Sequence, residues 1–252
     1  MNGDVINIMQ NKSRGIVFQI LLSQAVFLAT YFLIICQMAS ANYTDFPYHS
    51  QIAADFSIRN LKEEVMEGNT YFMWSMLVSR LYHWGKVSLP GACAVVTALT
   101  NVLTLNIVLE YMKKKIPNVD DNIWALFGGG LMFVGPLFVP WINSNYYLGT
   151  WSPNVWHNPT NNMARPFGVI STILILEIID AKEKVIRKHI VLAIMLGLSV
   201  IAKPSFLQGI APAMALFVII NTIYTKKFTG KNGFFLHYRL FRLYVLCYFR
   251  CG

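Results

Sequence analysis

Long apolar blocks divide this chain, and they constrain its fold more than any other feature. A helix needs about 20 apolar residues to cross the hydrocarbon core of a bilayer. Six segments fit a transmembrane reading: residues 15–38, 89–109, 123–143, 163–180, 190–202 and 206–224. The fifth is short and runs into Lys203-Pro204-Ser205, so it is either half of a helical hairpin or a broken helix. We therefore predict about six transmembrane helices.

The composition agrees with a membrane-embedded chain. Only 13% of the 252 residues are charged, whereas an average soluble domain is about 25% charged. High hydrophobicity excludes a disordered chain. The net charge of +9 does not indicate a nucleic-acid partner, because the 21 Lys and Arg residues cluster in short segments between the apolar blocks. We predict an all-α, polytopic integral membrane helical bundle over residues 1–230, with its protein partners left open.

The basic clusters orient this bundle. They precede the first segment, follow the second, join the fourth to the fifth and follow the sixth. With a cytoplasmic N-terminus, all of them lie inside, as the positive-inside rule requires. We therefore predict a multi-pass protein of the cell membrane with its N-terminus in the cytoplasm. The residues concerned are Lys12, Arg14, Lys113, Lys114, Lys115, Lys182, Lys184, Arg187, Lys188, Lys226 and Lys227.

The first segment has an alternative interpretation as a secretory signal. Ala39-Ser40-Ala41 resembles a signal-peptidase site after a basic and then an apolar stretch. That apolar stretch exceeds 20 residues, whereas the apolar region of a signal peptide has about 7 to 15. Its length favours an uncleaved first helix.

Residues 39–88 form the longest polar stretch and are predicted to face outside. Apolar positions recur there at the spacing of a helix: Met73, Leu77, Leu81 and Trp84. Three aromatic residues suit the lipid headgroup level: Trp74, Tyr82 and Trp84. We predict an interfacial helix on the outer leaflet, and an ordinary loop helix packed on the bundle is the alternative.

A second outside loop covers residues 144–160 and is rich in Asn, aromatic residues and Pro. Aromatic rings offer flat apolar faces to sugar rings, while Asn and His form hydrogen bonds with hydroxyl groups. The same composition is also typical of an aromatic belt with turn residues, which needs no ligand.

Three local strings and the order of the segments carry a resemblance. The strings are Asp45-Phe46-Pro47-Tyr48-His49, residues 152–160 and Ala202-Lys203-Pro204-Ser205. Together with a first helix followed by an outside loop with an early Asp, they resemble uncharacterised bacterial members of the GT-C superfamily of polytopic membrane glycosyltransferases. The resemblance covers about residues 15–225 and is more specific for architecture than for substrate.

The resemblance implies an enzyme that transfers a sugar from a polyprenyl-phosphate carrier on the outer face of the membrane. In that family an acid in the first outside loop acts as the base or helps to orient the acceptor, and Asp45 matches its position. Many relatives have a second acid directly after it, where this chain has Phe46. A divalent metal site is therefore not expected, and no cofactor is predicted.

Asp45 follows Met38 by seven residues, so it must stay near the outer membrane surface. A carboxylate there can take the proton of an acceptor hydroxyl, and cations can stabilise a leaving phosphate. We predict Asp45 as the base, with four substrate-binding residues around it: His49, His157, Arg165 and Lys203. The alternative for Asp45, which lies two residues before Pro47, is a helix cap or a turn.

Two other functions remain open. The short fifth segment and Pro204 favour a transporter or flippase, since broken helices often line transport sites. The apolar segments hold no charged residue near their middle, which counts against coupled transport. A non-catalytic membrane subunit is the other alternative.

The tail at residues 231–252 is aromatic and basic, with three Arg and no acid. It is predicted to be either an interfacial helix or the product of a shifted reading frame. Glycosyltransferases of the GT-C type usually have more than six spans. The chain is therefore expected to hold the N-terminal half of such an enzyme, and an inactive fragment is the alternative to an active enzyme.

Overall fold

The structure, a computed structural model, describes residues 2–40, 45–117, 119–133, 158–181 and 185–225. Within these ranges all regular structure is helical and no strand occurs, which confirms the all-α prediction. The helices in chain order are α1 (Asn2–Ser40), α2 (Phe46–Asp55), the 3-10 helix η1 (Ile58–Asn60), α3 (Leu61–Met66), α4 (Met73–Gly85), α5 (Leu89–Lys115), α6 (Asp121–Phe133), α7 (Pro159–Ile179), α8 (Ile186–Ala202) and α9 (Ser205–Thr225).

Three of the described helices are long and apolar enough to cross a membrane. They are Gly15–Ala39 within α1, Leu89–Lys115 and Pro159–Ile179. Shorter apolar stretches occupy Asn122–Phe133 and Ser205–Ile220. These helices indicate a membrane protein, but in the described residues only three, rather than six, meet the criteria of length and hydropathy together.

Several helices differ in extent from the predicted segments, because polar residues continue the helix past its apolar part. α5 runs to Lys115 rather than to residue 109, and the lysines of its last turn interact favourably with the negative end of the helix dipole. α7 begins at Pro159 rather than at residue 163, with Asn158 as its N-cap. The third predicted segment is described only as far as Phe133, and residues 134–143 lie outside the described ranges.

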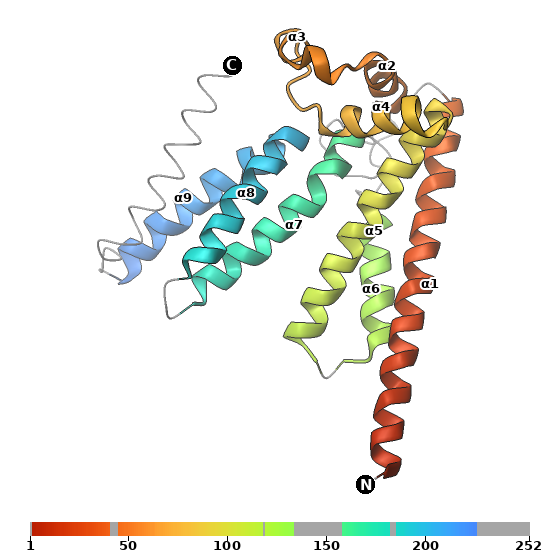
Figure 1. Ribbon diagram of the computed structural model, residues 1–252. Helices are drawn as coiled ribbons and strands as arrows, with labels where there is room; N and C mark the ends of the chain where they lie inside the picture. The colour runs from red at the N-terminus through yellow and green to blue at the C-terminus, as the bar shows by residue number, and fades with distance from the viewer. Residues whose placement is uncertain (1, 41–44, 118, 134–157, 182–184, 226–252) are drawn as a thin grey trace, which may run out of the picture.

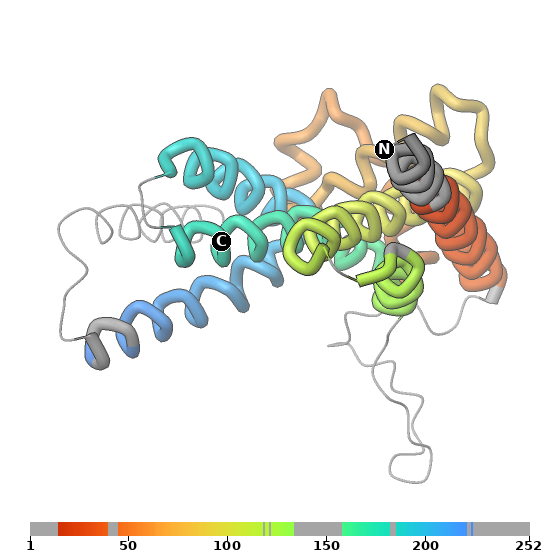
Figure 2. The backbone as a smooth tube through the Cα atoms, turned by 90° about the horizontal axis from the view of Figure 1, so that it is seen from below, coloured from red at the N-terminus to blue at the C-terminus, as the bar shows by residue number. Residues whose placement is uncertain are grey.

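The long helices run side by side, and α2, α3 and α4 lie across one end of them (Figure 1). We call this end the capped end. The opposite end, where Lys113, Lys114 and Lys115 form the last turn of α5, is the basic end. Viewed from the basic end, α5 and α7 are central, with α1 and α6 on one side and α8 and α9 on the other (Figure 2). The chain alternates in direction, so the α1–α2 and α8–α9 connections both lie at the capped end.

The basic end joins three helices through one carboxylate. Glu177 near the end of α7 lies 2.8 Å from Lys188 Nζ on α8 and 3.7 Å from Lys114 Nζ on α5. The last turn of α5 and the first turn of α8 therefore lie close to the end of α7.

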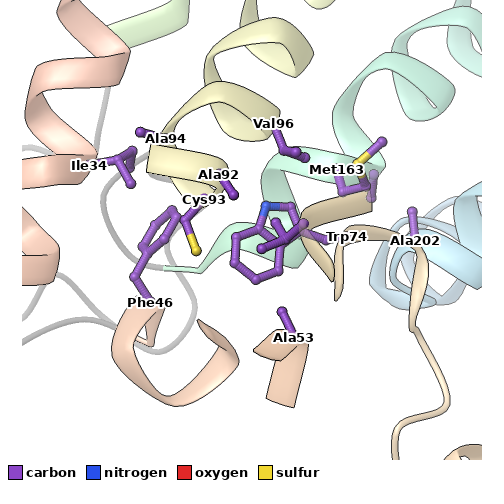
Figure 3. Close-up of a cluster of buried hydrophobic side chains, with 12 residues drawn as sticks. Ile34, Phe46, Ala53, Trp74, Ala92, Cys93, Ala94, Val96, Met163 and Ala202 are labelled. Atoms are coloured by element: carbon purple, nitrogen blue, oxygen red, sulfur yellow. The ribbon is translucent and has the colours of Figure 1, made fainter. Parts of the chain in front are cut away.

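Trp74 joins the cap to the bundle. Its side chain is completely buried at the centre of an apolar cluster from α1, α2, α4, α5, α7 and α8 (Figure 3). Its indole Nε1 donates a hydrogen bond to Thr97 Oγ1 on α5 over 3.2 Å. The prediction that Trp74 lies at the lipid headgroups is therefore wrong: α4 turns this residue toward the protein. Trp84, in the last turn of α4, is 76% exposed, and the Arg80 guanidinium stacks over its ring at 4.0 Å.

α6 packs against α5 through a glycine. A Cβ added at Gly128 would lie 2.7 Å from Leu109 Cδ2 and 3.2 Å from Leu105 Cδ1, both on buried leucines of α5. The absence of a side chain at Gly128 therefore lets the two helices approach closely.

Candidate functional site

Asp45 stands at the start of α2, as the capping alternative requires, but its side chain does not cap the helix. The carboxylate makes no hydrogen bond to the first backbone amides of α2. Pro47 fits the second helical position, where no amide donor is needed. Pro47 therefore does not interrupt the first turn of α2, in which the His49 amide donates a hydrogen bond to the Asp45 carbonyl over 3.0 Å. One turn of helix thus brings Asp45 and His49 to the same face.

Asn158 joins this face to α7, 113 residues further along the chain. Its Oδ1 accepts hydrogen bonds from the Thr160 and Asn161 backbone amides at 2.9 and 3.3 Å, which caps α7. Because Oδ1 is used for capping, Nδ2 must point the other way. Nδ2 donates to Asp45 Oδ2 over 2.7 Å and lies 3.4 Å from His49 Nε2. One side chain therefore starts a helix and positions two titratable groups.

His49 is neutral at physiological pH. It is 7% exposed, and its ring centroid lies 6.3 Å from that of Trp74. Burial lowers the pKa of His49 to about 4, the nearby Asp45 carboxylate opposes that change, and the charge of Lys203 adds to it. Because the Asn158 amide points a donor at Nε2, we assign the imidazole proton to Nδ1.

Lys203 brings a cation to the same end of the bundle. It follows α8 in an extended conformation, and its backbone amide donates to the Ser199 carbonyl over 2.7 Å. Its Nζ lies 6.0 Å from the centroid of the Tyr71 ring. Burial lowers the pKa of Lys203, while the Asp45 carboxylate acts in the opposite direction. A negative charge at Asp45 thus helps to keep this ammonium protonated.

Of the five residues predicted from the sequence, the structure brings Asp45, His49 and Lys203 close enough for their charges to act on one another. Arg165 lies about two turns further along α7 and lines a cavity of about 450 Å³ between α5, α7 and α9. This cavity also includes Asn161 and Ser205, which flank the cluster in sequence. His157 lies outside the described residues.

Sequence reasoning missed Asn158 as a site residue. The pair Asn158-Pro159 is a clear signal for a helix start, with Asn at the N-cap and Pro at the first helical position. That signal could have located the beginning of α7. It could not have shown that the same amide reaches Asp45, because that contact depends on how α2 packs against the bundle.

The cluster therefore combines a carboxylate, a neutral imidazole and a partly buried ammonium at one end of a helical membrane bundle. Within the described residues, no three His, Cys, Asp or Glu side chains gather as a metal site would require. Comparison of the chain with protein-family models, with curated proteins and with solved structures found no match. The argument for function accordingly rests on the geometry of this cluster.

Proposed function

We propose that this protein is a membrane glycosyltransferase of the GT-C type that takes a sugar from a polyprenyl-phosphate carrier. The observation that carries the proposal is the Asp45 carboxylate, which does not cap its helix and is positioned by Asn158 beside Lys203. An ordinary structural Asp at a helix start would hydrogen-bond the helix amides instead.

The proposed reaction needs a base and a cation, and the cluster offers both. The acceptor hydroxyl gives its proton to the Asp45 carboxylate as its oxygen bonds to the anomeric carbon of the sugar. The bond between that carbon and the phosphate oxygen breaks, and the phosphate leaves with the electron pair. Lys203 stabilises the negative charge that develops on it. His49 stays neutral, and Asn158 fixes the carboxylate.

The cavity at Arg165 fits the carrier lipid. Arg165 supplies a cation for phosphate, and the lining also contains apolar side chains such as Val169, Ile173 and Leu176. From Arg165 to Leu176 the α7 axis rises about 16 Å, which is about half the thickness of the hydrocarbon core. In this proposal the phosphate lies between Lys203 and Arg165, and the polyprenyl chain runs along α7 toward the basic end, where Leu176 precedes Glu177.

The alternating direction of the helices supports six spans, which we propose as α1, α5, α6, α7, α8 and α9. The lysines that end α5 and the basic residues that begin α8 lie at the basic end, which we place in the cytoplasm with the N-terminus. The capped end then faces outside the cell membrane. The exposed residues Leu77 and Trp84 support contact of α4 with the outer leaflet.

The first test is Asp45→Asn, assayed in membranes supplied with a panel of polyprenyl-phosphate-linked hexoses. We expect the release of free polyprenyl phosphate to be abolished while the abundance of the protein stays unchanged. The matched control is Asp55→Asn, because Asp55 is an exposed acid at the other end of α2. Full activity in the Asp45 variant would contradict the assignment of the base and favour a non-catalytic subunit.

The same membranes also test the transporter alternative. In the described residues, Lys203 and Pro204 lie in the connection between α8 and α9 at the capped end. A transport site would instead need polar groups near the middle of the membrane. Carrier-dependent uptake that persists in the Asp45 variant would favour transport over transfer.

A further inference from the structure

A second polar region lies far from the Asp45 cluster, between α1 and α5. Gln19 Nε2 donates to Asn106 Oδ1 over 2.8 Å, and Asn106 Nδ2 donates to Ser23 Oγ over 3.2 Å. Lys113 Nζ donates to Gln19 Oε1 over 3.0 Å. These bonds fix α1 against α5 and give the polar groups of this contact partners within the chain.

Gln24 lies next to this region but takes no part in it. Its side chain is exposed and makes no hydrogen bond to another described residue. It follows Gly15 by nine residues, so it lies about 14 Å into the span, near the middle of a hydrocarbon core about 30 Å thick. An amide at that depth has no water with which to form hydrogen bonds.

The surface around Gln24 has the form of a helix-packing face. Only 17% of the most apolar part of α1 is buried by the rest of the chain. Four exposed apolar residues recur on the Gln24 side of α1 at helical spacing: Val17, Leu21, Leu28 and Phe32. Beside them, α1 and α5 border an open hollow of about 600 Å³, and both Gln24 and Glu110 line it. A single polar residue within an apolar stripe is typical of helices that pair in a specific register.

We propose that this surface binds a second copy of the same chain through a two-fold axis perpendicular to the membrane. Such an axis brings Gln24 of each copy to the same depth. A primary amide carries both a donor and an acceptor, so two copies of Gln24 satisfy each other. The hollow beside each α1 receives side chains of the opposing α1, and the contact is isologous.

The experiment is cysteine cross-linking of the full-length chain in its membrane. A background without the native cysteines, with Cys93 replaced by Ala because it is buried, receives either Gln24→Cys or Ile194→Cys. Ile194 is the matched control, since it is 53% exposed at a similar distance from the basic end but belongs to α8, on the other side of the bundle. We expect a covalent dimer from the Gln24 position and at least about fivefold less from the Ile194 position.

Equal cross-linking at both positions, or none at position 24, would overturn the proposal. A cross-link to a different protein would overturn the second copy as the occupant. A second measurement keeps the native cysteines and counts subunits by single-molecule photobleaching. Gln24→Leu should lower the dimer association constant roughly threefold or more, whereas Gln24→Asn should retain most of it. An unchanged association constant in Gln24→Leu would contradict the pairing of the two Gln24 amides in the dimer. Asp45→Asn should leave this association unchanged, so the dimer and the proposed transfer reaction fail independently.

Discussion

Asn158 makes two separate contributions, a hydrogen bond to Asp45 and the N-cap of α7, and substitutions can measure them one at a time. Asn158→Ser keeps a capping oxygen for α7 but removes the amide donor to Asp45, whereas Asn158→Ala removes both. A hydrogen bond to a charged group contributes about 1.5–3 kcal/mol, and a helix N-cap about 1 kcal/mol. We therefore expect Asn158→Ser to cost about 1.5–3 kcal/mol of unfolding free energy and Asn158→Ala about 1 kcal/mol more. Asn158 is 7% exposed, so solvent does not replace the lost partner well.

A double-mutant cycle with Asp45→Asn isolates the bridge from the cap. Unfolding free energies are measured in mixed micelles for the wild type, Asn158→Ser, Asp45→Asn and the double variant. If the amide binds the charged carboxylate, Asn158→Ser should cost about 1 kcal/mol or less when Asp45 is already neutral. A coupling energy indistinguishable from zero would refute the reasoning, because the two side chains would then act independently.

Three further perturbations follow from the geometry. Burial lowers the pKa of His49 from 6.5 to about 4, so the unfolded chain binds more protons than the folded chain between these pH values. The unfolding free energy should therefore be highest above pH 6.5 and fall by about 3 kcal/mol as the pH drops to 4. Thermal unfolding at several pH values should show this loss in the wild type and not in His49→Gln. Lys203→Met should raise the pKa of His49, since the ammonium lowers it, and the same pH series should then show a smaller loss of stability in acid. Gly128→Ala should lower the unfolding free energy by about 1–3 kcal/mol relative to Gly130→Ala. The reason is that the new methyl group contacts Leu109 at position 128 but meets open space at position 130. Equal melting temperatures of the two variants would show that α5 and α6 can move apart without cost.

Sequence reasoning located the helices well because apolar length is a local property. The predicted segments at residues 190–202 and 206–224 correspond closely to α8 (Ile186–Ala202) and α9 (Ser205–Thr225). Their boundary at Lys203-Pro204 also follows from local rules, since a proline disfavours helical conformation in the preceding residue. Ends that continue past the apolar stretch, as in α5, were placed too early because helix caps and dipoles extend helices into polar sequence.

The candidate site could be predicted only in part. Asp45 and Lys203 were placed at the same end of the bundle by counting residues from the apolar segments, and their electrostatic interaction agrees with that. Trp74 illustrates what the method misses: a tryptophan next to a membrane segment suits either lipid headgroups or a protein core, and only packing decides. The bridge from Asn158 to Asp45 depends on a contact across 113 residues of chain, and periodicity carries no information on such contacts.

The spread of the cluster along the chain has a consequence for biogenesis. Asp45 and His49 emerge early, Asn158 follows only after α6, and Lys203 comes after α8. The carboxylate therefore has no amide to hold it until α7 enters the membrane, and no neighbouring ammonium until the α8–α9 hairpin has formed. During synthesis the segment that carries Asp45 and His49 stays incompletely assembled while the ribosome adds more than 150 residues. Quality-control factors in the membrane would therefore first encounter a chain in which α2, α3 and α4 are complete and the later helices of the bundle are not yet made.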